Sequence, residues 1–255
     1  MENAGNAKHE QERGAIKDMS HLHIPDGVLP GWLVMAGWIL TAVILAFSIY
    51  RTRKTELKRK IPLIGIISAL MIVCMTIPIV PIAYHINLSV IAGIILGPAV
   101  AFISIFIVDL IIAMFGHGGV TVIGLNTMVV GTEAFIGFYL FQLFLAIIGR
   151  DSIMWSSGLA AVIALVVSTS ILVGIVYASQ INPAIVIGIE ESHPTEATHE
   201  AHVPNELIKG VNVKSFAKTL LILLGIGWLL EGIITAFVIK YVSRVRPDLI
   251  LPQRA

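Results

Sequence analysis

Long apolar segments restrict the fold of this chain more than any other feature of its sequence. The stretch from Ile86 to Gly149 is almost continuously apolar, and its clearest breaks are Gly97-Pro98 and the glycine-rich residues 116–119. A membrane-spanning helix needs about 20 apolar residues, so this stretch has room for three spans, although the piece before Gly97 is short for a full crossing. Hydrophobic residues make up 56% of the chain and charged residues 13%, which excludes a soluble domain of this size.

Four more apolar segments complete the prediction of an all-α bundle in the membrane, at residues 31–50, 61–83, 153–179 and 218–241. We therefore expect a polytopic bundle of about seven transmembrane helices, with a broken segment at His117-Gly118-Gly119, because glycines in that number favour an interruption of a helix. The expected organisation is a polar, disordered N-terminal extension at 1–18 and a membrane domain at 19–250.

Basic residues at the ends of the spans predict the orientation of the chain. The loop after the first span has one acidic residue, Glu56, among six basic ones: Arg51, Arg53, Lys54, Lys58, Arg59 and Lys60. By the positive-inside rule this loop is cytoplasmic, which places the N-terminus outside. Seven crossings then leave the C-terminus inside, and the basic tail at 240–246 agrees with this placement. We expect a multi-pass protein of the cell (cytoplasmic) membrane.

Two histidines, His21 and His23, precede the first span in a segment that Pro25 and Gly27 keep from being helical. Neutral imidazole nitrogens are common ligands of nickel, cobalt, copper and zinc. The alternative is that Pro25-Asp26-Gly27 is a turn into the membrane with solvated histidines beside it. The alternation of the spans favours the metal interpretation, because it places every membrane-adjacent histidine on the outer face.

Three other histidine-bearing segments fall on that face. His85 follows the proline-ended second span, and His117 lies among glycines with Asn126 downstream. The extracytoplasmic loop at 180–213 is acidic and contains three histidines, so it can concentrate cations by its negative potential. The alternatives are an interfacial histidine bonded to a carbonyl, a tight bend between spans, and a solvated disordered connection.

Three carboxylates, Asp109, Glu133 and Glu231, lie within apolar spans, where an unpaired charge is costly. We expect each to face the interior of the bundle, paired or protonated. For Glu133 and Glu231, a polar contact between helices explains the residue at least as well as contact with a substrate. Small residues allow close helix contacts within the bundle or toward a partner subunit, and the candidates are Gly37, Gly137, Gly158, Gly225 and Gly227.

Taken in order, several motifs resemble those of the CbiM/NikM family, the substrate-capture (S) membrane subunits of energy-coupling-factor cobalt and nickel transporters. The resemblance covers the chain from about Ser20 to the end. The motifs are His23-Ile24-Pro25-Asp26-Gly27, His85 followed by residues 93–98, the segment His117 to Thr127, Glu231-Gly232, and Arg244 to Leu249.

The resemblance implies a metal held near the outer surface by an N-terminal amine, the adjacent amide nitrogen, the imidazole of His23 and that of His85. It also implies that a second group of residues forms the wall around the metal: His117, Asn126, Asp26, Gly118 and Gly119. Four nitrogens in a square suit Ni(II), whereas selection of Co(II) depends on affinity, supply and shape. The metal is the transported substrate rather than a cofactor, and the family delivers it to cobalamin synthesis or to nickel enzymes.

This sequence departs from the family pattern at its N-terminus, because twenty-two residues precede His23. The implied amine is therefore missing as the sequence is written. Three explanations remain open: cleavage before Leu22, a start at Met19 whose removal exposes Ser20-His21, or a site in which His21 replaces the amine.

Energy for transport is expected to come from partners, since this sequence contains no Gly-rich phosphate loop with Lys-Ser/Thr. The resemblance implies a transmembrane coupling subunit, ATP-binding subunits and a small accessory membrane subunit. We expect no enzymatic activity and no nucleic-acid partner. One alternative is a capture subunit for an organic micronutrient, which an aromatic content of 7% disfavours. The other is a membrane metalloenzyme, whose site usually adds a carboxylate and a general base.

Overall fold

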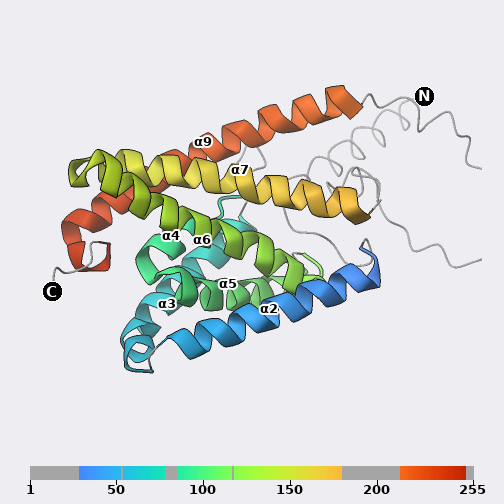
Figure 1. Cartoon of the computed structure of the whole chain (residues 1–255), viewed down its shortest axis with the longest axis horizontal. Coiled ribbons are helices and arrows are strands. Elements are labelled where there is room, and N and C mark those ends of the chain that lie inside the picture. The colour runs from blue at the N-terminus through green and yellow to red at the C-terminus, as the bar shows by residue number, and fades with distance from the viewer. Residues whose placement is uncertain (1–28, 53, 78–84, 117, 180–212, 251–255) are drawn as a thin grey trace, which may run out of the picture.

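A computed structural model describes residues 29–52, 54–77, 85–116, 118–179 and 213–250, and within these ranges the chain is helical without any β-strand. The described part contains two short 3-10 turns, η1 (Arg150–Ser152) and η2 (Pro247–Leu249). Its helices, drawn in Figure 1, are α2 (Gly31–Arg51), α3 (Lys54–Thr76), α4 (Ser89–Leu96), α5 (Pro98–Met114), α6 (Ile123–Ile148), α7 (Ile153–Ser179) and α9 (Val213–Val245). The predicted all-α fold is thus confirmed.

Four segments of these helices are long and apolar enough to cross a membrane: Gly31–Arg51, Ile123–Ile148, Arg150–Ile175 and Leu224–Val245. Two shorter apolar helices, Lys60–Thr76 and Pro98–Met114, fall slightly below that length. The expected span at 153–179 matches α7, whereas the described part of the expected 61–83 span is helical only as far as Thr76. The number of crossings and their orientation stay predictions.

Helix α4 differs from the full-length span that the apolar stretch suggested. It has eight residues, so it is about 12 Å long and cannot cross about 30 Å of hydrocarbon by itself. Its end is set by Gly97, which has φ 81° and is followed by a proline in the first turn of α5. All eight residues of α4 are buried. Helix α4 alone therefore does not account for the third expected crossing.

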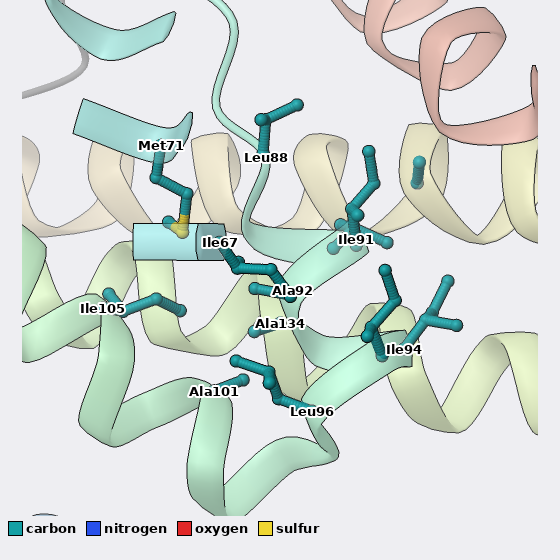
Figure 2. Packing of buried hydrophobic residues seen from close by; sticks show 14 of the residues in the cluster. Ile67, Met71, Leu88, Ile91, Ala92, Ile94, Leu96, Ala101, Ile105 and Ala134 are labelled. Atoms are coloured by element: carbon teal, nitrogen blue, oxygen red, sulfur yellow. The ribbon is translucent and has the colours of Figure 1, made fainter. Parts of the chain in front are cut away.

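The core of the bundle surrounds α4. Figure 2 shows Ile67 and Met71 of α3, Ile105 of α5 and Ala134 of α6 around it, and these residues belong to one buried cluster. Lipid tails are as apolar as these side chains, so the cluster is stabilised by close packing rather than by removal from water. The stability of this part of the bundle therefore depends on how closely α4 packs against its neighbours.

Glycines allow the closest of these approaches. A Cβ atom added to Gly93 would lie 2.9 Å from the carbonyl carbon of Ala134, so the backbones of α4 and α6 are in direct contact. Of the candidate glycines, Gly137 faces the Val90 side chain, and Gly158 of α7 faces the backbone of α9. Gly37 packs against Leu125 of α6, whereas a Cβ atom added to Gly225 would meet no atom of the described residues within 4 Å.

The basic residues that predicted the orientation gather at one end of the bundle. Figure 1 shows the end of α2, the connection between α6 and α7, and the end of α9 on the same side. These places contain Arg51, Arg150 and Arg244. Such a clustering is the arrangement that the positive-inside rule requires of a cytoplasmic face.

Candidate functional site

Several of the predicted site residues lie outside the described residues, namely His21, His23, Asp26 and His117, together with the extension at 1–18 and the acidic part of the loop at 180–213. The structure places the other predicted residues, which are His85, Asn126, Gly118 and Gly119. Their roles at a metal site stay predictions.

His85 is partly buried and lies in a non-helical segment, residues 85–88, that leads directly into α4. Non-helical backbone at membrane depth occurs where it lines a cavity or is enclosed by protein. Segment 85–88 meets that condition through the contacts of Asn87, two residues after His85. The position of the histidine therefore depends on the residues that bind Asn87.

Asn87 forms hydrogen bonds through its backbone N–H and through both polar atoms of its side chain. Its backbone N–H donates to Oε1 of Glu231 in α9 at 2.6 Å. Its Oδ1 accepts from the N–H of Ser89 at 3.0 Å, which closes a local turn at the start of α4. Its Nδ2 donates to Oε2 of Glu133 in α6. One asparagine thus joins α4 to two helices that follow it in the chain.

Glu133 is 1% exposed and accepts two further hydrogen bonds. The hydroxyl of Ser89 donates to Oε2 and the hydroxyl of Ser168 in α7 donates to Oε1, each at 2.6 Å. Glu231 is 3% exposed. Both carboxylates therefore face the interior and are paired, as expected, and they pair between helices. The sequence did not predict that Asn87 connects the two carboxylates. The available signal was that Asn87, like Glu133 and Glu231, is a polar residue within an apolar stretch.

The third carboxylate, Asp109, is also buried and paired. Its Oδ2 accepts a hydrogen bond from the Thr127 hydroxyl at 2.9 Å, which links α5 to the first turn of α6. Asn126 lies beside Thr127 and is 3% exposed. The predicted wall residue is therefore enclosed in the bundle at the outer end that the orientation predicts for the metal.

The chain before α6 is glycine-rich and held by α2. The described residues between α5 and α6 are non-helical, and Gly116 and Gly118 have positive φ angles of 78° and 86°, which favour glycine. Trp38 donates from Nε1 to the Thr121 carbonyl at 2.6 Å, and Thr41 donates to the Gly124 carbonyl at the same distance. These contacts fix the segment that flanks position 117.

Within the described ranges no three His, Cys, Asp or Glu side chains come together in an arrangement that holds a metal ion. His85 lies within the described ranges, whereas the other imidazole that the resemblance implies, His23, lies outside them. Asn87, Ser89 and Ser168 donate hydrogen bonds to carboxylate oxygens of Glu133 and Glu231. Carboxylates that already accept these bonds suit a structural contact better than metal coordination.

Comparison with known proteins gives a family match over most of the chain. The CbiM family model, described as the cobalt uptake substrate-specific transmembrane region, matches residues 23–249. A Methanocaldococcus jannaschii protein, provisionally named as a metal transport protein, is 30% identical over 234 residues, which cover 89% of this chain and 94% of that one. The cobalt transport protein CbiM of Geobacter sulfurreducens is 28% identical over 247 residues, which cover 90% of this chain and 61% of that one.

Two crystal structures of transition metal transporters, one of them truncated, have the same fold. Their TM-scores are 0.62 for the truncated protein and 0.61 for the other, at 19% sequence identity in each case. The likeness covers 88% of this chain, and 99% and 93% of the two other chains. At this level of identity the likeness concerns the fold alone.

Proposed function

This chain belongs to the CbiM family of cobalt-uptake substrate-specific transmembrane proteins, and on that premise we propose that it captures Co(II) or Ni(II) for an ATP-driven energy-coupling-factor importer. The observation that carries the proposal is the family match, which begins at His23 and extends beyond Glu231. The matched residues include His23, His85 and His117.

We propose His23 and His85 as metal ligands, with His21 as the alternative to an N-terminal amine. The wall of the site consists of His117, Asn126, Asp26, Gly118 and Gly119. The partial burial of His85 on non-helical backbone supports this role, because a ligand must be both accessible to the ion and held in place. The metal is the cargo of the protein, so no resident cofactor and no enzymatic step are needed.

Three partners complete the proposal: a transmembrane coupling subunit, ATP-binding subunits and a small accessory membrane subunit. The proposed complex lies in the cytoplasmic membrane and delivers metal for cobalamin synthesis or nickel enzymes. Its test is metal uptake by cells, which we expect to require co-expression of the ATP-binding subunits. Uptake at the same rate without them would contradict the energy-coupling assignment.

The metal site is tested by equilibrium binding of Ni(II) and Co(II) to purified protein whose N-terminus has been determined. The test variant is the double substitution His23→Ala, His85→Ala. The matched control replaces the three histidines of the acidic loop, at positions 193, 199 and 202, by alanine. We expect one equivalent of metal to bind to the wild type and to the control, and none to the double variant.

Two results would contradict this site. Retained binding in the double variant would move the metal to His21, His117 or the acidic loop. If folded, correctly processed protein binds neither metal, the transition-metal assignment is wrong and an organic substrate becomes the better candidate. The two metal affinities, measured in parallel, identify the preferred cargo.

A further inference from the structure

We propose that Glu231 and Glu133 are positioning residues that hold the His85-bearing segment at a fixed depth in the bundle. The inference rests on the proposed function, since it assigns these carboxylates to the support of a metal-binding loop. Neither carboxylate needs to touch the metal. Both act through Asn87, which lies two residues after His85.

The geometry explains why Asn87 controls the histidine. Two residues of extended chain span at most about 7 Å, so a fixed Asn87 confines the backbone of His85 to a small volume. The N–H of Asn87 belongs to no helix, and in a membrane an unsatisfied backbone donor is costly. Glu231 supplies its acceptor at 2.6 Å. Loss of this acceptor therefore favours movement of the segment to another depth.

The second carboxylate fixes the direction of the segment. Glu133 accepts from the Asn87 side chain and from the Ser89 hydroxyl, so it binds residues on both sides of Leu88. Ser168 of α7 holds the other oxygen of Glu133 at 2.6 Å. Three helices, α6, α7 and α9, thus determine where α4 begins. Only one residue, Ile86, separates Asn87 from His85. A fixed start of α4 therefore also restricts the position of His85.

Substitutions at position 231 can distinguish the negative charge of Glu231 from its function as a hydrogen-bond acceptor. The Asn87 N–H needs an acceptor oxygen, which a glutamine at position 231 also provides. We therefore expect Glu231→Gln to preserve the segment and Glu231→Ala to release it. A residue that bound the metal directly through its charge would give a different pattern, with both variants impaired.

The experiment compares Glu231→Ala, Glu231→Gln and Asn87→Ala with the wild type in the full-length, correctly processed protein. The matched control, Ser68→Ala, removes a buried hydrogen bond between α3 and α5 in which Asn87 takes no part. Hydrogen exchange of the amides at 85–92 is measured without metal. Ni(II) affinity and the visible absorption of bound Ni(II) are then measured on the same samples.

We expect Glu231→Ala to speed exchange of the segment at least about tenfold and to weaken Ni(II) binding about 10- to 100-fold, the range found for residues that orient metal ligands. The absorption of bound Ni(II) should shift in this variant because the imidazole moves. Glu231→Gln should restore all three readouts. Asn87→Ala, which keeps the backbone N–H, should give an intermediate effect, and Ser68→Ala should leave segment exchange and absorption unchanged.

Unchanged exchange in Glu231→Ala would overturn the positioning role whatever the metal data show. Equal losses in Glu231→Ala and Ser68→Ala would overturn it as well, since the effect would then be general destabilisation. A parallel His85→Ala variant separates this failure from that of the proposed function. If His85→Ala binds Ni(II) as the wild type does, the proposed ligand is wrong, and the metal-free exchange data alone decide whether the carboxylates hold the segment.

Discussion

Replacement of Glu133 by alanine tests the polar cluster in the middle of the bundle. The substitution removes the acceptor of three hydrogen bonds, donated by Asn87, Ser89 and Ser168. Hydrogen bonds between membrane helices contribute on average about 0.6 kcal/mol each and at most about 1.7 kcal/mol. If all three are lost, we expect the free energy of unfolding to fall by about 2–5 kcal/mol.

Glu133→Gln should cost far less, about 1 kcal/mol or below. Its amide oxygen can accept from Asn87 and Ser89, while its NH₂ group faces the Ser168 hydroxyl. That hydroxyl can accept instead of donate, and it has the carbonyl of Val129 3.4 Å away as another acceptor for its own proton. The pairing is therefore preserved with one bond reversed.

The assay is reversible unfolding of the purified protein in detergent, followed by circular dichroism. The matched control is Thr132→Ala on the same helix, because the hydroxyl of Thr132 bonds the Met128 carbonyl of its own helix. We expect this control to change stability by less than about 0.5 kcal/mol. A Glu133→Ala variant as stable as the control would refute the assignment of Glu133 to interhelical pairing.

Three further predictions concern contacts elsewhere in the bundle. Gly93→Ala forces a Cβ atom against the facing backbone of α6, so it should lower the free energy of unfolding by about 1–3 kcal/mol. The control is Gly65→Ala, whose Cβ atom would meet no described atom within 4 Å; it should raise the free energy of unfolding slightly in the same assay. Lys60→Met removes the 2.9 Å hydrogen bond to the last carbonyl of α4 and should cost about 0.3–1 kcal/mol in thermal unfolding, with Lys60→Arg as the control. Arg246 lowers the pKa of Asp248 through a side-chain hydrogen bond, so their pairing is complete above the ordinary aspartate pKa of 3.8 and is lost only as the pH falls through the lowered pKa of the folded protein. Carboxyl NMR of the wild type and of Arg246→Ala, in which the pKa should rise, checks the direction.

The sequence was sufficient to predict the class of the fold and the location of most helices. Apolar length defined α2, α6 and α7, because a membrane helix must satisfy every backbone group internally. It did not predict the start of α4 at Ser89, because the apolar stretch already begins at Ile86 and the contacts that hold Asn87 come from distant helices. The Gly97-Pro98 pair marked the end of α4 clearly, because neither residue continues a helix from there.

The sequence indicated that Glu133 and Glu231 face the interior, but it did not identify their partners. The cost of a charge in hydrocarbon applies to each residue separately, whereas pairing depends on contacts between distant helices. The same holds for glycines: Gly93 and Gly225 both lie in apolar segments, and the structure alone distinguishes the packed position from the open one. For the candidate metal site, the structure adds the support of His85, while the other proposed ligands rest on the sequence.

The contact between Asn87 and Glu231 has a consequence for the biogenesis of this protein. The two residues are 144 positions apart in the chain, and Glu231 lies in α9, the last α-helix of the described residues. A ribosome therefore exposes the start of α4 long before it synthesises the acceptor that α4 requires. The hydrogen bond to Glu231 can form only after α9 has been translated, so a chain truncated before α9 lacks one of the contacts that hold the start of α4.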